Sequence, residues 1–109
     1  LELANTALKK YPNSHFFLFL KARALFEQKN YALAIDYYQD IVEKLINMKE
    51  TYSNIDLFNS YYFLAMSFNN LGNKVKARSY FELAIKCDLT VIEKERLEDR
   101  IDDLKDIFE

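Results

Sequence analysis

The amino-acid sequence predicts an all-α fold of about six helices, and three observations lead to this prediction. The 109 residues include one Gly and one Pro, which is too few for a turn-rich β fold and typical of long helices with short connections. Half of the residues are apolar, among them eight Tyr and nine Phe, so the chain can bury one hydrophobic core and is not disordered. A pattern of small and large residues also occurs twice, which indicates repeated helical pairs.

In both copies of this pattern, a turn is followed by an Ala and then by large residues three and four positions later. The copies are residues 25–38, LFEQKNYALAIDYY, and residues 68–81, FNNLGNKVKARSYF. Two helices can cross closely only where a side chain is as small as Ala, and a large residue one turn later fills the space beside it. The pattern therefore predicts close helix crossings at Ala34 and Ala77.

The repeated pattern resembles the tetratricopeptide repeat (TPR), a pair of helices with a period of 34 residues. The end of one unit is matched where Ala7 is followed five positions later by Pro12, which cannot continue a helix. Counting on from Pro12 by this period places small residues at Ala22 and Ala34, and both are present. In the following unit the family's signature positions are filled by Tyr61, Leu64, Ala65, Phe68, Gly72, Ala77, Phe81 and Ala84. The resemblance implies a right-handed α-α superhelix of antiparallel helix pairs.

The register predicts where each helix begins and ends. Helices are expected at residues 1–11, 15–28, 31–48, 56–71, 74–87 and 91–108. Asn30 and Asn73 stand where an N-cap side chain accepts a hydrogen bond from the next turn. Gly72 suits the left-handed residue that ends the preceding helix, and the equivalent Lys29 must adopt this geometry at a cost of about 1 kcal/mol or form another turn.

The same register divides the chain into segments. These are the end of a truncated repeat (1–14), a repeat (15–48), an insertion (49–57), a second repeat (58–89) and a capping helix (90–109). The insertion is expected because Ala34 and Ala77 are nine positions further apart than one period. We expect the preceding helix to extend into it and Ser53 or Asn54 to start the next helix early; a loop is the alternative. The chain starts at Leu1 without Met, which suggests a fragment of a larger protein.

The last segment has the pattern of a terminal capping helix. Thr90 and Glu93 form a capping-box sequence, and an apolar stripe recurs at helical spacing on one face: Leu97, Ile101, Leu104 and Phe108. The remaining residues are mostly charged. A polar outer face with one apolar stripe is what a last repeat needs to shield its hydrophobic side from water. A coiled coil is the weaker alternative, because two heptads are too few.

The sequence shows no motif for catalysis, a cofactor or a metal. His15 is the single histidine and is expected to cap a helix or face solvent. Cys87 is expected to be a packing residue rather than a reactive thiol. Four carboxylates could be imagined as a cation site, but they lie on a regular helix without the loop that calcium requires: Asp99, Asp102, Asp103 and Asp106. Because these residues offer no catalytic, cofactor or metal motif, we expect no enzymatic activity.

The net charge of −2 suggests no nucleic-acid footprint, and no apolar run reaches membrane length.

The resemblance also implies a binding surface. In TPR proteins the first helix of each pair lines the concave face, and ligand contacts come from a stripe along it. Carried over, this stripe comprises Phe16, Phe19, Arg23, Phe26, Glu27, Asn59, Tyr62, Phe63, Met66, Asn69 and Asn70. The alternative, that the aromatic residues Phe16, Phe19 and Phe63 belong to the core, stays open at this stage. The Lys and Asn clamp of chaperone-tail receptors is not matched, because Phe19, Arg23 and Phe63 occupy its positions.

These observations favour a protein-binding scaffold that holds a peptide or helix of a partner on its concave face. One alternative is a self-association module, in which apolar edges at Leu1, Ala4 and Leu8 or the aromatic stripe pair two copies. Another is a regulatory arm of a larger enzyme or transport protein. The partner is not identified by the sequence.

Overall fold

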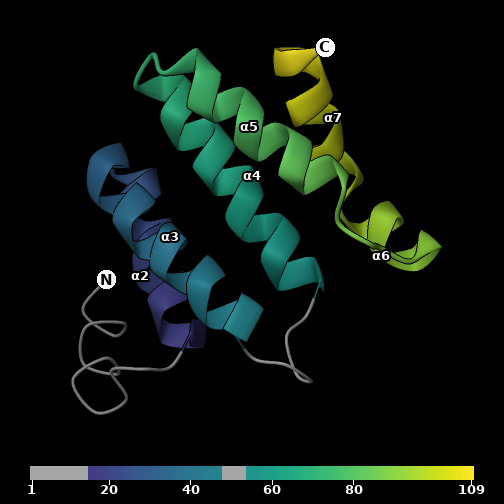
Figure 1. Ribbon diagram of the computed structural model, residues 1–109, viewed down its shortest axis with the longest axis horizontal. Coiled ribbons are helices and arrows are strands. Elements are labelled where there is room, and N and C mark those ends of the chain that lie inside the picture. The colour runs from purple at the N-terminus through teal and green to yellow at the C-terminus, as the bar shows by residue number, and fades with distance from the viewer. Residues whose placement is uncertain (1–14, 48–53) are drawn as a thin grey trace.

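The computed structural model describes residues 15–47 and 54–109, and within these ranges every regular element is a helix (Figure 1). The helices are α2 (His15–Glu27), α3 (Tyr31–Asn47), α4 (Asn54–Asn70), α5 (Lys74–Ile85), α6 (Val91–Arg96) and α7 (Glu98–Phe108). The all-α prediction is confirmed. The helix expected at residues 1–11 and the first part of the expected insertion, residues 49–53, lie outside the described residues.

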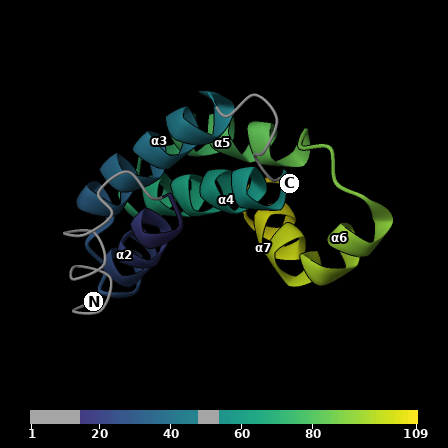
Figure 2. The same ribbon diagram turned by 90° about the horizontal axis from the view of Figure 1, so that it is seen from below.

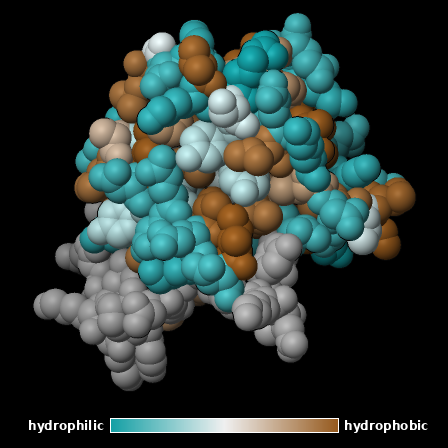
Figure 3. Space-filling model, viewed as in Figure 1, coloured by the Kyte–Doolittle hydropathy of each residue, from teal (hydrophilic) through white to brown (hydrophobic). Residues whose placement is uncertain are grey.

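Consecutive helices pack against one another, α2 on α3, α3 on α4 and α4 on α5. In Figure 2, α3 and α5 lie on one side of α4, and α2 and α7 lie on the other side. The side of α2, α4 and α7 is called the inner side below. Figure 3 shows part of the opposite face, where hydrophilic side chains surround separate hydrophobic areas.

The turn between α2 and α3 and the turn between α4 and α5 have the same backbone geometry. Lys29 and Gly72 both adopt positive φ, at 63° and 83°. In each turn the amide of the following Asn donates to a carbonyl five positions earlier, Asn30 to Leu25 and Asn73 to Phe68, both at 2.9 Å. This bond is typical of the Schellman motif that ends a helix. The left-handed residue predicted at Gly72 is confirmed, and of the two options that the sequence left open for Lys29 the structure shows the left-handed one.

The small residues of the repeated pattern are fully buried. Ala34 and Ala77 have no exposed surface, and Ala22 and Ala65 are equally buried. The core also contains larger side chains, and the largest fully buried one is Tyr38. Asn73 caps α5, since its side chain accepts a hydrogen bond from the amide of Lys76 at 3.2 Å.

The expectation of one continuous helix at residues 91–108 is wrong. The helix breaks at Leu97 into α6 and α7, although the predicted capping box of Thr90 and Glu93 is present at the start of α6. The two parts differ in packing: α6 has no buried residue, whereas α7 buries Leu104 and Phe108. At the break Leu97 has φ −102° and ψ 9°, and α6 and α7 run in different directions (Figure 1).

Candidate functional site

A groove lies on the inner side, where α2, α4 and α7 come together. Its volume is about 280 Å³. Helix α2 contributes one wall, α4 the floor and α7 a single residue of the opposite wall. The lining residues are Phe16, Phe19, Leu20, Arg23, Asp56, Asn59, Phe63 and Arg100.

The floor of the groove is a packed aromatic cluster around Phe63. The Phe63 ring is 5% exposed and stacks on Tyr38, with ring centroids 5.2 Å apart and planes inclined by 9°. Phe26 and Tyr62 meet Phe63 edge to face, at 5.1 and 5.0 Å between centroids. Phe19 meets Tyr38 in the same way at 5.8 Å. Such pairs are stabilising beyond their buried area, so the floor is well packed.

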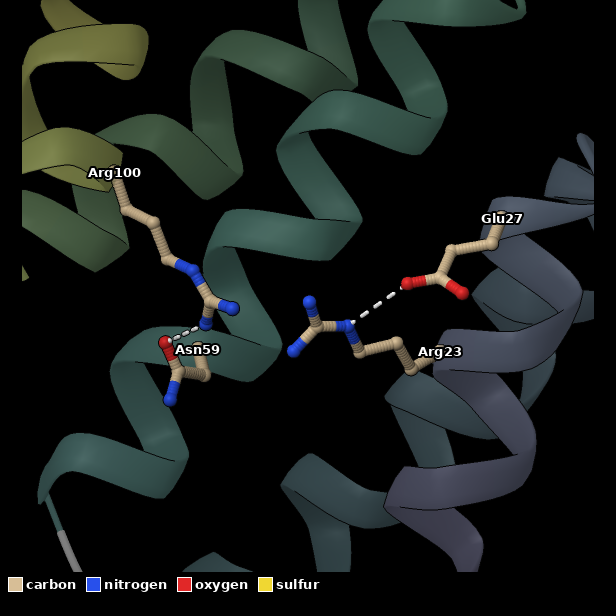
Figure 4. A network of polar contacts seen from close by, with 4 residues as sticks. All are labelled: Arg23, Glu27, Asn59 and Arg100. Atoms are coloured by element: carbon tan, nitrogen blue, oxygen red, sulfur yellow. Dashed lines mark hydrogen bonds and ion pairs between the residues drawn. The ribbon is translucent and has the colours of Figure 1, made fainter.

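Two guanidinium groups lie over this floor. The Cζ of Arg23 is 5.6 Å from the centroid of the Phe63 ring, and that of Arg100 is 4.9 Å from it. The Nε of Arg23 donates to the carboxylate of Glu27 at 3.3 Å, and Arg100 donates to the side-chain oxygen of Asn59. The two side chains point toward one another across α4 (Figure 4). Cations over an aromatic face are attracted by the ring quadrupole, which explains this shared position.

Burial and charge shift the pKa values of several groups here. Burial, and then the positive charge of Arg23, lower the pKa of Arg100. Burial raises the pKa of Tyr38 well above its usual range, against the opposing effect of the two arginines. Burial and then the carboxylate of Asp103 raise the pKa of Tyr62. Both tyrosines are therefore neutral near pH 7, and the charges of the groove come from its arginines and carboxylates.

Helix α7 is fixed in place by contacts with α4 and α5. The hydroxyl of Tyr62 donates to Asp103 at 3.1 Å, and Arg78 donates to the carbonyl of Phe108 at 2.6 Å. The rings of Phe81 and Phe108 stack at 5.1 Å. These contacts hold Arg100, near the start of α7, at the edge of the groove.

Five of the eleven residues predicted for the binding stripe line the groove: Phe16, Phe19, Arg23, Asn59 and Phe63. The question of core or surface has a different answer for each aromatic residue. Phe16 is 59% exposed, Phe19 is half-buried and Phe63 is buried. Tyr62 is 9% exposed and lies beneath Arg100, whose guanidinium is 5.3 Å from its ring centroid.

The remaining stripe residues lie beside the groove or further along the helices. Glu27 is exposed and bonded to Arg23, while Phe26 and Met66 are half-buried against the core. Asn69 accepts a hydrogen bond from Lys74 at 2.6 Å, and Asn70 donates to the carbonyl of Met66 at 2.9 Å. Asn70 thus bonds within α4, and Asn69 bonds to the first residue of α5.

Sequence reasoning missed Leu20, Asp56 and Arg100. The signal for Leu20 was present, since it lies one turn after Phe16 on the same face of α2. The sequence singled out Arg100 only as one of the charged residues of the last segment. It borders the apolar stripe at Leu97 and Leu104, but only the packing of α7 shows that it reaches the floor formed by α4.

The other residues considered for chemistry have ordinary surroundings. Burial raises the pKa of the Cys87 thiol to about 11, so this half-buried group stays protonated near pH 7. Asp103 is bonded to Tyr62, and across the described ranges no three His, Cys, Asp or Glu side chains are grouped as metal ligands. His15 is the first residue of α2, and its side chain lies outside the described part. Of the described helices, none has the length and apolar character needed to cross a membrane.

Comparison with known proteins adds a family to this geometry. Two family models described as tetratricopeptide repeat match the sequence, one over residues 1–47 and one over residues 58–89. The chain belongs to the tetratricopeptide repeat family. TPR units generally mediate protein–protein interactions and form non-catalytic scaffolds. Neither the curated proteins nor the solved structures gave a match.

Proposed function

We propose that this TPR domain is a protein-interaction module that binds a peptide or helix of a partner in the groove between α2, α4 and α7, with no reaction of its own. One observation carries the proposal: apolar side chains are exposed beside convergent polar groups on a well-packed floor. Phe16 and Leu20 are 59% and 41% exposed, and Arg23, Asn59 and Arg100 lie next to them in the groove. Aromatic and Arg side chains in such pockets dominate the energetics of many protein interfaces.

The size of the groove supports a local rather than an enveloping contact. A volume of about 280 Å³ is at the lower end of ligand pockets. It is suited to one or two side chains of a partner segment, while the rest of that segment runs along α2 and α4. The polar groups of the groove can orient the segment through hydrogen bonds.

The proposal is tested by affinity capture from the source cells. The protein is compared with a Phe16→Ala, Arg23→Ala variant and with Val75→Ala, a control on α5 whose side chain is 79% exposed outside the groove. We expect a partner to be recovered by the parent and the control and to be lost by the double variant, with unchanged circular dichroism. Equal recovery by all three proteins would contradict the proposal.

Self-association is the second candidate, because the same exposed Phe16 and Leu20 could pair two copies. Light scattering over a range of concentrations distinguishes it from partner binding. A mass that rises with concentration and falls to that of a monomer in Phe16→Ala would favour self-association. A constant monomer mass would exclude it as the function of this surface.

A further inference from the structure

The groove contains a charge arrangement that specifies the chemistry of its partner. Arg23 belongs to α2 and Arg100 to α7, yet both guanidinium groups lie within 6 Å of the centroid of one ring, that of Phe63. Like charges at such a site repel one another, and the partial burial of Arg100 reduces the screening of its charge by water. An anion placed between them would turn this repulsion into attraction.

The described residues offset these charges only in part. Arg23 pairs with Glu27 through Nε, and both side chains are more than half exposed, at 52% and 64%, so this pair is weak. The acceptor for Arg100 is the neutral amide of Asn59, and no carboxylate in residues 15–47 or 54–109 forms an ion pair with it. Burial, and then the positive charge of Arg23, also lower the pKa of Arg100. The partly buried cation at this wall thus lacks a described counter-ion.

The orientation of the two side chains leaves donors available between them. Arg23 uses Nε for Glu27, and its two terminal nitrogens point toward Arg100 (Figure 4). Arg100 uses one terminal nitrogen for Asn59. Guanidinium groups bind carboxylates through pairs of parallel N–H bonds, and such charge-assisted bonds are stronger than neutral ones.

The neighbouring surface specifies a second feature of the partner. Phe16 and Leu20 lie on the same wall as Arg23 and are the exposed apolar residues of the groove. A segment whose carboxylate lies between the arginines would place the adjacent side chain against this apolar wall. That side chain must be apolar to gain from the contact.

We propose that Arg23 and Arg100 form a subsite over Phe63 for the carboxylate of an Asp or Glu in a partner protein, with an apolar neighbour of that residue on Phe16 and Leu20. This inference rests on the proposed function and deepens it. A carboxylate is favoured over a phosphate because Asp56 lines the same groove and Glu27 lies beside Arg23. These negative charges repel a dianion more strongly than a monoanion.

A displayed library of short random peptides, selected on the protein, provides the probe. We expect the selected peptides to share an acidic residue next to an aromatic or aliphatic one. One of them is then synthesised in three forms, with Glu, Gln or phosphoserine at the acidic position, and its dissociation constant is measured. The Glu form should bind about tenfold or more tightly than the Gln form, and binding should weaken as salt is raised.

Variants of the protein assign this preference to the two arginines. Arg100→Gln and Arg23→Gln should each remove most of the difference between the Glu and Gln peptides. The matched control is Arg96→Gln, an exposed arginine of α6 outside the groove, which should leave the difference unchanged. Arg23 is exposed, so its variant tests the subsite even if Arg100→Gln alters the packing of α7.

The outcomes separate the subsite from the proposed function. Peptides that lose binding in Phe16→Ala but carry no acidic residue, or ignore both arginine variants, would overturn the subsite and leave the groove as a binding surface. A phosphoserine form that binds more tightly than the Glu form would also overturn it. Failure to select any peptide, or binding that Phe16→Ala does not affect, would overturn the proposed function and the subsite together.

Discussion

Helices α2 and α4 both lie on the inner side and carry similar aromatic stripes, yet they expose them very differently. Phe16 and Leu20 on α2 are exposed, at 59% and 41%, while Phe58, Tyr62 and Phe63 on α4 are buried. The difference follows from their neighbours, because α7 packs over Tyr62 through Arg100 and Asp103. The comparison teaches that an aromatic stripe becomes core or stays exposed according to which helix covers it.

The largest effect on stability should come from truncating a buried aromatic side chain of α4. Phe63→Ala removes the ring that joins Tyr38, Phe26 and Tyr62, and we expect it to lower the free energy of unfolding by about 3 to 5 kcal/mol. Phe16→Ala should change it by less than about 0.5 kcal/mol, because the side chain is mostly exposed. Urea denaturation followed by circular dichroism measures both. Equal losses would mean that the two helices do not differ as described.

Overpacking the helix crossings should have the next largest effect. Ala77→Leu and Ala34→Leu each force a larger side chain into a position with no exposed surface, which we expect to cost about 1 to 3 kcal/mol. Thermal unfolding is the measurement, with Ala32→Leu as a control at an exposed position of α3. A midpoint for Ala77→Leu that equals that of the parent would show that the register of the repeated pattern is wrong.

The two turns allow a smaller and more exact comparison, since they share one backbone shape but differ in residue. Gly72→Ala should lower the free energy of unfolding by about 1 kcal/mol through backbone strain alone, because an added Cβ meets nothing within 4 Å. Lys29→Gly should raise it, by less than about 1 kcal/mol, because relief of the left-handed strain is offset by greater freedom of the unfolded chain. Opposite signs support the shared geometry, and a loss of stability in both variants speaks against it.

An effect of about the same size as those at the turns concerns the contact between α7 and α4. Tyr62→Phe removes the hydrogen bond to Asp103 and keeps the ring, so it should cost about 0.5 to 1.5 kcal/mol. In the background of Asp103→Asn the same change should cost less, because the charged acceptor is already gone. A double-mutant cycle with no coupling would indicate that α7 is not held on α4 through this pair.

Local chemistry explains why much of the fold could be predicted from the sequence. The left-handed turns at Lys29 and Gly72, the cap at Asn73 and the capping box at Thr90 each depend on residues within one or two helical turns. The buried Ala34 and Ala77 followed from a pattern that occurs twice. The residues that determine these features lie next to them in the sequence.

The rest of the site depends on contacts that local patterns do not encode. Asn59 meets Arg100, and Tyr62 meets Asp103, across 41 positions of the chain in each case. The break at Leu97 is not marked by a helix-breaking residue in the sequence, since neither Gly nor Pro is present there. The lining residues of α2 were therefore predictable in large part, whereas the contribution of α7 was not.

Site-specific photo-crosslinking in the source cells tests the central claim most directly, because it reads which face of the domain a partner contacts. A photoreactive residue is placed at Leu20 in the groove or at Leu83 on α5, positions with nearly equal exposure, 41% and 42%. We predict that a partner is trapped at Leu20 and not at Leu83, and that Arg23→Gln reduces the yield at Leu20. Crosslinks that form at Leu83 and not at Leu20 would contradict the assignment of the inner groove as the binding surface.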